Sequence, residues 1–244
     1  MLTKLKSNIR KMISGNHFPN LDSAVIEINN VKELKKIFGW KNDAILDDPI
    51  LNEFDYLEDV NERRLRDAES IATVMCNSNP AIALEIGTSS GRTTALMSVN
   101  APKSSIHTMN IPPEEILSGE GGTYTTIALE RDKIGAYYRS KNLTNIVQIL
   151  ANSAKWEPNI GTIDVAFIDG SHDTDFVYKD TLKVLSAMKP GSFIMWHDFN
   201  LDLTKKHNWI HTVCAGIEKL YVDKKLNGRI YHLRDSWVGI YQVK

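Results

Sequence analysis

The stretch AFIDGSHDTDF concentrates ionisable side chains at the end of an apolar run, where Asp169 is followed closely by His172. A later apolar run, SFIMWHDF, ends in the same way at His197 and Asp198. Carboxylates and imidazoles are the groups that hold divalent ions and move protons in enzymes. These four side chains are therefore the first candidates for an active site.

Two kinds of chemistry are open to this set. Asp169 and Asp198 would give a divalent ion the oxygen ligands that Mg²⁺ prefers, and a third ligand from His197 would favour Mn²⁺. In the alternative, the carboxylates are only hydrogen-bonded, and His172 or His197 serves as a general base that titrates near neutrality. We predict Asp169, His197 and Asp198 as metal ligands, and His172, His197 and Asp169 as the catalytic residues.

The other charges of the first stretch have a structural interpretation. Asp173 and Thr174 are residue types that cap helix N-termini, and Asp175 suits a first helical turn. An apolar periodic segment follows them and ends before Pro190 and Gly191, which is typical of a helix. We therefore assign residues 173–175 to a helix cap and leave them outside the predicted site.

The segments that must position these residues alternate between two patterns. Short apolar runs predict buried strands at 81–87, 104–111, 145–152, 163–170 and 192–198. Helical periodicity is found at 61–79, 91–101, 125–142, 173–188 and 210–225, and a closing antiparallel hairpin is expected from 228–233 and 237–243. Such alternation predicts an α/β fold with a mostly parallel sheet, whose strand carboxyl ends bind ligands.

The first sixty residues lack this regularity. They are rich in Asn and Asp and contain short helical patches, such as 31–38. We expect an N-terminal helical extension over residues 1–60 and one domain over residues 61–244. Within the extension, residues 2–13 predict an amphipathic helix, which would pack on the body of the protein, on a second subunit or on a membrane surface.

The end of the first predicted strand, LEIGTSSGRTT, contains a glycine turn. Gly87 and Gly91 allow a tight turn and a close approach of a ligand to the backbone. A dinucleotide fingerprint is excluded because Ser89 and Arg92 occupy positions that require glycine, and the glycine spacing also excludes a phosphate-binding loop. Glu85, just before the turn, would repel a pyrophosphate but would suit a cationic amine or ribose hydroxyls.

This segment resembles the first motif of the Rossmann-like, S-adenosylmethionine-dependent methyltransferases, in which an acid precedes a glycine-rich turn. Together with FIDGSH and WHDF, it resembles a bacterial group of small-molecule and sugar O-methyltransferases, over roughly residues 62 to 242. The resemblance implies a Rossmann-like, doubly wound sheet. It also implies transfer of a methyl group from S-adenosylmethionine to a small-molecule or glycan hydroxyl, assisted by Mg²⁺ or Mn²⁺.

The resemblance further implies which residues contact the cofactor. They lie at the predicted strand ends and are Glu85, Gly87, Thr88, Ser89, Gly91, Asn110, Asn152, Ser153 and Asp169. One of them departs from the family pattern, because Asn110 stands where many members have an acid that binds the ribose. An amide still bonds to a hydroxyl but without charge assistance. Glu114 or Glu115 are the candidates to replace that acid.

Composition limits the classes of partner. The formal net charge is −1, so no global positive field attracts nucleic acid, and no apolar run is long enough to span a bilayer. Cys76 and Cys214 form no CxxC pair, so we expect a reducing, cytoplasmic setting. The expected partner is the small-molecule or glycan acceptor, and a homo-oligomer is compatible with the sequence.

Two other functions stay open at this level. A nicotinamide-dependent oxidoreductase could use a similar sheet, although the GxGxxG pattern is broken. A non-catalytic cofactor-binding protein of the same fold is the second alternative, and Asn110 is the residue that keeps it open.

Overall fold

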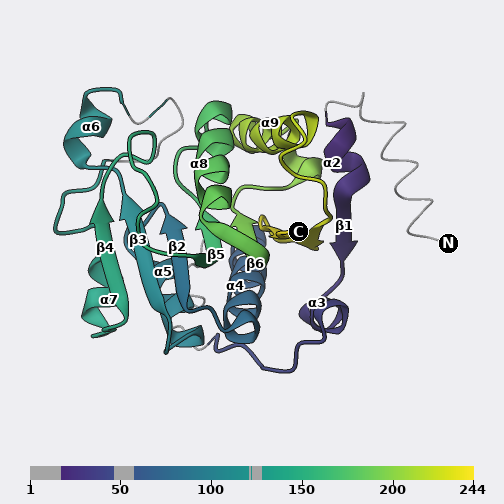
Figure 1. Cartoon of the computed structure of the whole chain (residues 1–244), viewed down its shortest axis with the longest axis horizontal. Coiled ribbons are helices and arrows are strands. Elements are labelled where there is room, and N and C mark those ends of the chain that lie inside the picture. The colour runs from purple at the N-terminus through teal and green to yellow at the C-terminus, as the bar shows by residue number, and fades with distance from the viewer. Residues whose placement is uncertain (1–17, 47–57, 121, 123–127) are drawn as a thin grey trace.

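One eight-stranded sheet organises the computed structural model, which describes residues 18–46, 58–120, 122 and 128–244 (Figure 1). The strands are β1 (Val25–Ile28), β2 (Ile82–Ile86), β3 (Ser105–Asn110), β4 (Ile146–Leu150), β5 (Ile163–Ile168), β6 (Met188–Trp196), β7 (Ile230–Leu233) and β8 (Gly239–Gln242). Their order is β1-β7-β8-β6-β5-β2-β3-β4. Every neighbouring pair is parallel except the two that include β8, which confirms the mostly parallel sheet and the closing hairpin.

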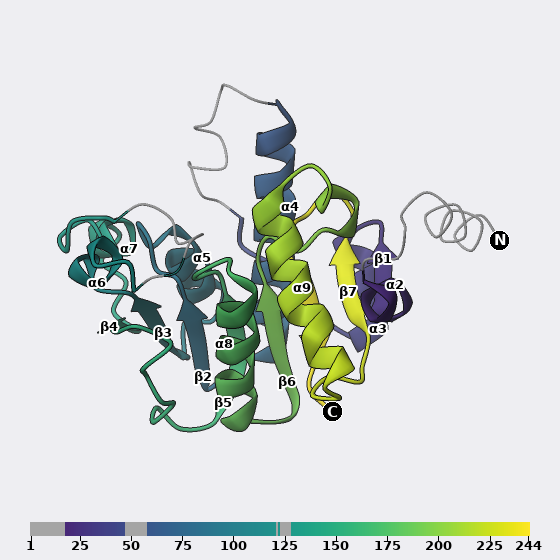
Figure 2. The same ribbon diagram turned by 90° about the horizontal axis from the view of Figure 1, so that it is seen from above.

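Helices cover both faces of this sheet. They are α2 (Pro19–Ala24), α3 (Val31–Phe38), α4 (Glu58–Ser78), α5 (Arg92–Asn100), α6 (Pro113–Leu117), α7 (Ala136–Ser140), α8 (Thr174–Ser186), α9 (Asn208–Val222) and the short 3-10 turn η2 (Leu201–Leu203). Figure 2 shows α8 and α9 on one side and α4 and α5 on the other. Within the described residues, none of these helices has the length and apolar character needed to cross a membrane.

The central strands are apolar because both of their faces are covered. β5 and the second half of β6 are almost wholly buried, as expected for parallel strands between two helical layers. One apolar cluster joins the sheet to α8 and α9 through side chains such as Trp196 and Ile217, and the other joins it to α4 and α5 through Met75 and Met97. These two cores fix the carboxyl ends of β2, β5 and β6 side by side.

The N-terminal region differs from the expected helical extension. Residues 25–28 form β1, which extends the sheet as a parallel neighbour of β7. The preceding helix α2 is tied to α9, since the Glu218 carboxylate accepts hydrogen bonds from the backbone N–H groups of Asn20 (3.1 Å) and Leu21 (2.9 Å). Sequence patterning missed β1 because its four residues are too few to show a period. The expected amphipathic helix at 2–13 lies outside the described residues.

A second correction concerns the helix expected over 125–142. In its described part only Ala136–Ser140 is helical, and Gly135 before it has a positive φ of 70°. The backbone N–H groups of Gly135 and Tyr137 donate to the carbonyls of Ser89 and Ser90 in the glycine turn, each at 2.9 Å. This segment therefore braces the turn instead of continuing a helix.

Candidate active site

The strand ends enclose a cavity of about 460 Å³. Its wall includes Asp169, His172, His197 and Asp198, so the four side chains singled out by their residue types converge, as the parallel-sheet argument predicts. The wall also includes the apolar side chains of Ile111, Ile116, Leu129 and Phe176. Charged and apolar groups therefore line the same cavity.

A second cavity, of about 300 Å³, lies on the other side of the same strand ends. It shares Arg64, Gly87, Ser89, Asp169 and His197 with the first cavity and extends between α4 and α5. The shared residues place the glycine turn, Asp169 and His197 at the junction of the two spaces.

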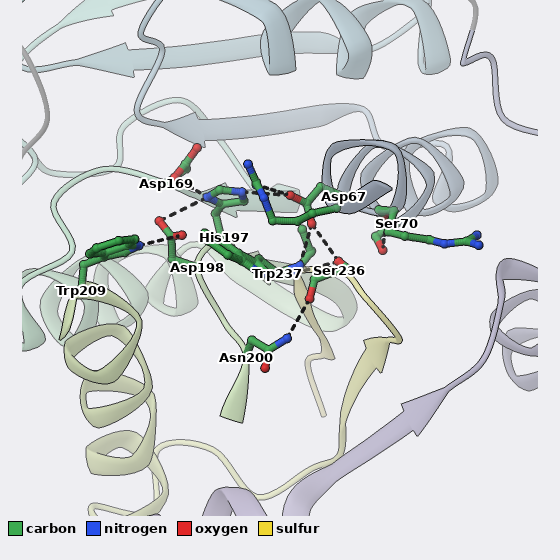
Figure 3. A network of polar contacts seen from close by, with 12 residues as sticks. Asp67, Ser70, Asp169, His197, Asp198, Asn200, Trp209, Ser236 and Trp237 are labelled. Atoms are coloured by element: carbon green, nitrogen blue, oxygen red, sulfur yellow. Dashed lines mark hydrogen bonds and ion pairs between the residues drawn. The ribbon is translucent and has the colours of Figure 1, made fainter. Parts of the chain in front are cut away.

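The charged cluster is held together by imidazole–carboxylate contacts. His172 Nε2 lies 3.0 Å from Asp198 Oδ2 and 3.9 Å from Asp169 Oδ1. His197 Nδ1 lies 3.1 Å from Asp169 Oδ1 and 3.4 Å from Asp198 Oδ2 (Figure 3). Each histidine thus bridges both carboxylates, which would otherwise repel one another.

These contacts set the protonation states. Burial opposes the charged form of every member, but the ion pairs and hydrogen bonds outweigh it. The pKa of His172 is raised to about 9 by Asp169 and Asp198, and the pKa of His197 lies well above its ordinary value for the same reason. Burial also raises the pKa of Asp169 and Asp198, yet His197 and His172 hold both below the ordinary value. The carboxylates therefore favour the charged form of both imidazoles, and the imidazoles favour the ionised form of both carboxylates.

Asp198 is held in an uncommon backbone conformation. Its φ is +51°, in the left-handed region that L-residues enter at a cost of about 1 kcal/mol, although Asp tolerates it better than most. Its flanking amides are fixed, since His197 N donates to Ile168 O at 3.1 Å and Phe199 N donates to Trp237 O at 2.9 Å. Trp209 Nε1 donates to Asp198 Oδ1 at 3.3 Å. The strand end is thus built to turn this carboxylate toward β5.

The donor set fits a divalent ion. Among the described residues, Asp169, His172 and Asp198 each offer one ligand atom, and these atoms lie within 4.8 Å of one another. Two carboxylates and an imidazole suit Mn²⁺ or Mg²⁺, provided that His172 first loses its proton. His197, the histidine expected from the sequence as a ligand, is not in this group, although its Nδ1 lies 3.1 Å from Asp169 Oδ1. The geometry thus favours His172 over His197 as the third ligand.

The glycine turn is required by packing as well as by ligand access. Gly87 has a φ of +109°, and a Cβ there would lie 2.0 Å from the carbonyl oxygen of Asp169. Gly91 has a φ of +88°, and its Cβ would lie 2.6 Å from the ring of Tyr138. A larger residue at Gly87 would therefore displace the end of β5 before it touched any cofactor. A loss of cofactor binding in such a variant would not by itself locate the cofactor.

Glu85 occupies a different place from the one expected of a cofactor ligand. Its side chain is fully buried beneath the turn and is not part of either cavity wall. The hydroxyl of Thr94 donates to Oε2, and that of Thr108 does so at 2.5 Å, while Oε1 has no hydrogen-bond partner in the described part of the chain. Burial raises the pKa of Glu85 to about 8, against the hydrogen bonds from Thr108 and Thr94. The carboxyl group is therefore neutral at pH 7.

Most of the other expected cofactor residues line a cavity, and one of them only supports the turn. Gly87, Ser89, Asn110, Asn152, Ser153 and Asp169 lie in the wall of the larger cavity, Thr88 lines only the smaller one, and Gly91 lines neither. The amide of Asn110 already bridges the backbone, accepting from Ser89 N (3.0 Å) and donating to Ile111 O (2.9 Å). The proposed substitute acids are engaged elsewhere, since Glu114 pairs with Arg131 and Glu115 bonds to Asn152 and Lys155.

The larger cavity has the chemistry that S-adenosylmethionine requires. An ionised carboxylate, Asp169, lies beside the glycine turn and can face the cationic methionine part. Amide groups and apolar side chains further along the wall, from Asn110 and Asn152 to Phe176, can receive a ribose and a flat base. The residues present therefore fit this cofactor.

Two parts of the site escaped sequence reasoning. Arg64 lines both cavities, and Asp67 contacts His197, yet both lie on α4, far from the strand-end motifs. Asp67 could have been noticed because it is an acid next to Ala68, on the apolar side of a predicted helix, where a charge is unusual. No spacing rule connects such a position to His197.

Comparison with known proteins identifies the central segment. Residues 84–199 match a family model described as "Methyltransferase domain". No curated protein is similar enough in sequence to count as a match. The fold is shared with the O-methyltransferase NovP, with a TM-score of 0.56 and 12% identity over 75% of this chain and 80% of that chain.

It is also shared with the methyltransferase PaMTH1 of Podospora anserina, solved with S-adenosylhomocysteine bound. That comparison gives a TM-score of 0.55 and 15% identity, over 90% of this chain and 98% of that chain. The matched segment runs from β2 to the end of β6 and contains the glycine turn. Residues 84–199 thus match a methyltransferase domain, and the chain has the Rossmann-like fold of these methyltransferase structures.

Proposed function

We propose that this protein is an O-methyltransferase that moves the methyl group of S-adenosylmethionine to a hydroxyl of a small molecule or glycan, with help from a divalent ion. The observation that carries the proposal is the position of the larger cavity. It lies over the glycine turn, and its wall includes the Asp169 and Asp198 carboxylates. Residues 61–244 are, on this proposal, the catalytic unit.

The wall of the larger cavity supports a direction for the cofactor. Its apolar side chains, Ile111, Leu129 and Phe176, would hold the base, and Asn110 would bond to the ribose hydroxyls. Ser89 and Asp169 would face the methionine part. The reacting methyl group would then point toward the junction of the two cavities, where His197 and Asp169 lie.

The hydroxyl of the acceptor must lose a proton, and the charged cluster is the only group of the described wall placed to manage it. Alignment of the acceptor against these side chains would supply much of the rate. The carboxylates raise the pKa of His172 and of His197, so each imidazole holds its proton more tightly than a free one. A raised pKa makes either histidine less available as a metal-free general base at neutral pH.

A divalent ion would fit the same residues. Asp169, Asp198 and the deprotonated His172 would hold it. Such an ion lowers the pKa of a bound hydroxyl and fixes its position. His197 would remain beside the ligands and hold the two carboxylates in place.

Calorimetry with S-adenosylmethionine and with NAD tests the class of cofactor directly. We expect saturable binding of S-adenosylmethionine and no binding of NAD. Binding of NAD alone would support an oxidoreductase and contradict the proposal. Transfer of isotope-labelled methyl to a panel of phenol, sugar and aliphatic alcohol acceptors then separates an enzyme from a non-catalytic cofactor-binding protein.

The metal is tested by excess EDTA followed by Mg²⁺ or Mn²⁺. Turnover should stop and then return. Full activity in chelator, lost on His172→Ala, would instead support the general-base alternative. The free cysteines Cys76 and Cys214 are compatible with a cytoplasmic setting, which belongs to the same proposal.

A further inference from the structure

Asp67 of α4 lies at the back of the charged cluster and is almost completely buried, with 6% of its surface exposed. Oδ1 accepts hydrogen bonds from Trp237 N at 2.6 Å and from Ser236 Oγ at 3.0 Å. Oδ2 lies 2.8 Å from Arg63 Nη1 and 3.2 Å from His197 Nε2 (Figure 3). One side chain therefore connects α4, the β7–β8 connection and the end of β6.

The four partners make a carboxylate necessary at this position. Trp237 N and the Arg63 guanidinium are obligate donors, and Ser236 Oγ donates here as well. His197 completes the set as a donor through Nε2–H. An amide in place of the carboxylate has one acceptor oxygen and one donor nitrogen, so two of the four donors would face N–H groups.

We propose that Asp67 is a positioning residue for methyl transfer, which fixes the ring of His197 so that Nδ1 faces Asp169 and Asp198. The proposal rests on the function proposed above. With Nε2–H bound to Asp67, the imidazole has one orientation in which Nδ1 reaches the two carboxylates, at 3.1 and 3.4 Å. A buried acid that orients a histidine through its other nitrogen is a recurring device in catalytic sites.

The two carboxylate oxygens of Asp67 have different partners, so a positioning role can be distinguished from a structural one. Oδ1 accepts from the connection between β7 and β8, whereas Oδ2 contacts His197 and Arg63. Ser236→Ala removes a donor from Oδ1 and leaves the His197 contact intact, so it is a matched control. Asp67→Asn changes the contacts of both oxygens.

The first experiment compares these variants. Asp67→Asn should lower kcat about 10- to 100-fold, as expected for loss of a partner behind a functional histidine, with cofactor affinity unchanged within about threefold. Ser236→Ala should lower the melting temperature but keep kcat within about twofold. Equal losses of kcat in the two variants would overturn the proposal and leave Asp67 a structural tie.

A double-mutant cycle with His197→Gln asks whether Asp67 acts through His197. In the His197→Gln background, Asp67→Asn should cause no more than about a twofold further loss of kcat, because the ring that it orients is absent. Fully multiplicative losses would show that Asp67 acts by another route.

Nitrogen NMR of the histidine side chains tests the positioning without any turnover. The wild-type protein should show a proton on His197 Nε2 that exchanges slowly with water, and Asp67→Asn should abolish it while Ser236→Ala preserves it. A wild-type spectrum without that proton contradicts the proposal even if Asp67→Asn does not fold. If calorimetry finds no cofactor binding but the slow proton is present, the proposed function fails and the orientation of His197 stands.

Discussion

Two pairs of acids near the strand ends and the core of this protein behave in opposite ways. Asp169 and Asp198, at the ends of β5 and β6, have lowered pKa values and line the larger cavity. Glu85 beneath the glycine turn and Asp180 on α8 have pKa values raised to about 8 and about 6, mainly by burial, and line neither cavity. The residue types are alike, and three of the four are almost fully buried.

The difference comes from the partners. Asp169 and Asp198 share two imidazoles, whose charges compensate the loss of water. Glu85 and Asp180 have neutral hydroxyl partners, from Thr108 and Ser153, and each keeps one oxygen without a hydrogen bond in the described part of the chain. Burial alone therefore does not make an active-site acid, because a charged partner decides whether the carboxyl stays ionised.

Removal of one charged carboxylate should have the largest effect. We expect Asp198→Asn to lower kcat about 10²- to 10⁴-fold, since it removes a proposed metal ligand and the acceptor of the His172 bond. Labelled methyl transfer at saturating substrate measures this loss. Asp202→Asn, on the nearby turn η2, is a control that should retain activity. If Asp198→Asn kept the wild-type rate, Asp198 would not be a functional acid, and the two pairs would not differ in function.

Glu85 should show the opposite behaviour, with an effect on stability. Its folded-state pKa of about 8 lies above the ordinary value of 4.5, so its contribution to stability is fully present below about pH 4.5 and is lost as the pH rises through about 8. Glu85→Gln cannot ionise and should be more stable than the wild type by about 3 kcal/mol at pH 7. Urea unfolding at pH 5 and pH 8 should show the advantage growing with pH. An advantage independent of pH would mean that Glu85 is ionised in the folded protein.

Metal binding should depend on pH through His172. Because the pKa of His172 is about 9, a metal must displace its proton at neutral pH. We expect Mn²⁺ affinity to rise by up to about tenfold per pH unit between pH 7 and 9 and to level off above that. Calorimetry in buffers of different ionisation enthalpy would count the protons released. Affinity that does not change with pH would show that metal binding displaces no proton from His172.

The smallest effect concerns the ribose contact. Asn110→Asp would place a charged acceptor in the cavity wall and keep the bond from Ser89 N, but would lose the donation to Ile111 O. Charge-assisted bonds to the ribose hydroxyls should tighten cofactor binding about two- to fivefold. Calorimetry with S-adenosylhomocysteine measures this change. Weaker binding would show that the main role of Asn110 is to hold the backbone of the glycine turn.

The sequence by itself determined the local features of this protein. Apolar runs located β2 to β6, and the glycine turn was visible because Gly87 and Gly91 are needed at positive φ. The strand-end acids Asp169 and Asp198 could be named because parallel strands bring their carboxyl ends together. These properties follow from periodicity and backbone sterics, which depend only on neighbouring residues.

Tertiary structure alone decided how those residues are used. The contact between Asp67 and His197 joins positions far apart in the chain, and β1 is stabilised as a strand by its pairing with β7. Glu85 stands next to a glycine turn in sequence, but packing of Thr94 and Thr108 around it makes it a neutral core residue instead of a cavity ligand. Charge state and metal-ligand geometry arise from through-space distances and desolvation, and a linear pattern of residue types does not contain either quantity.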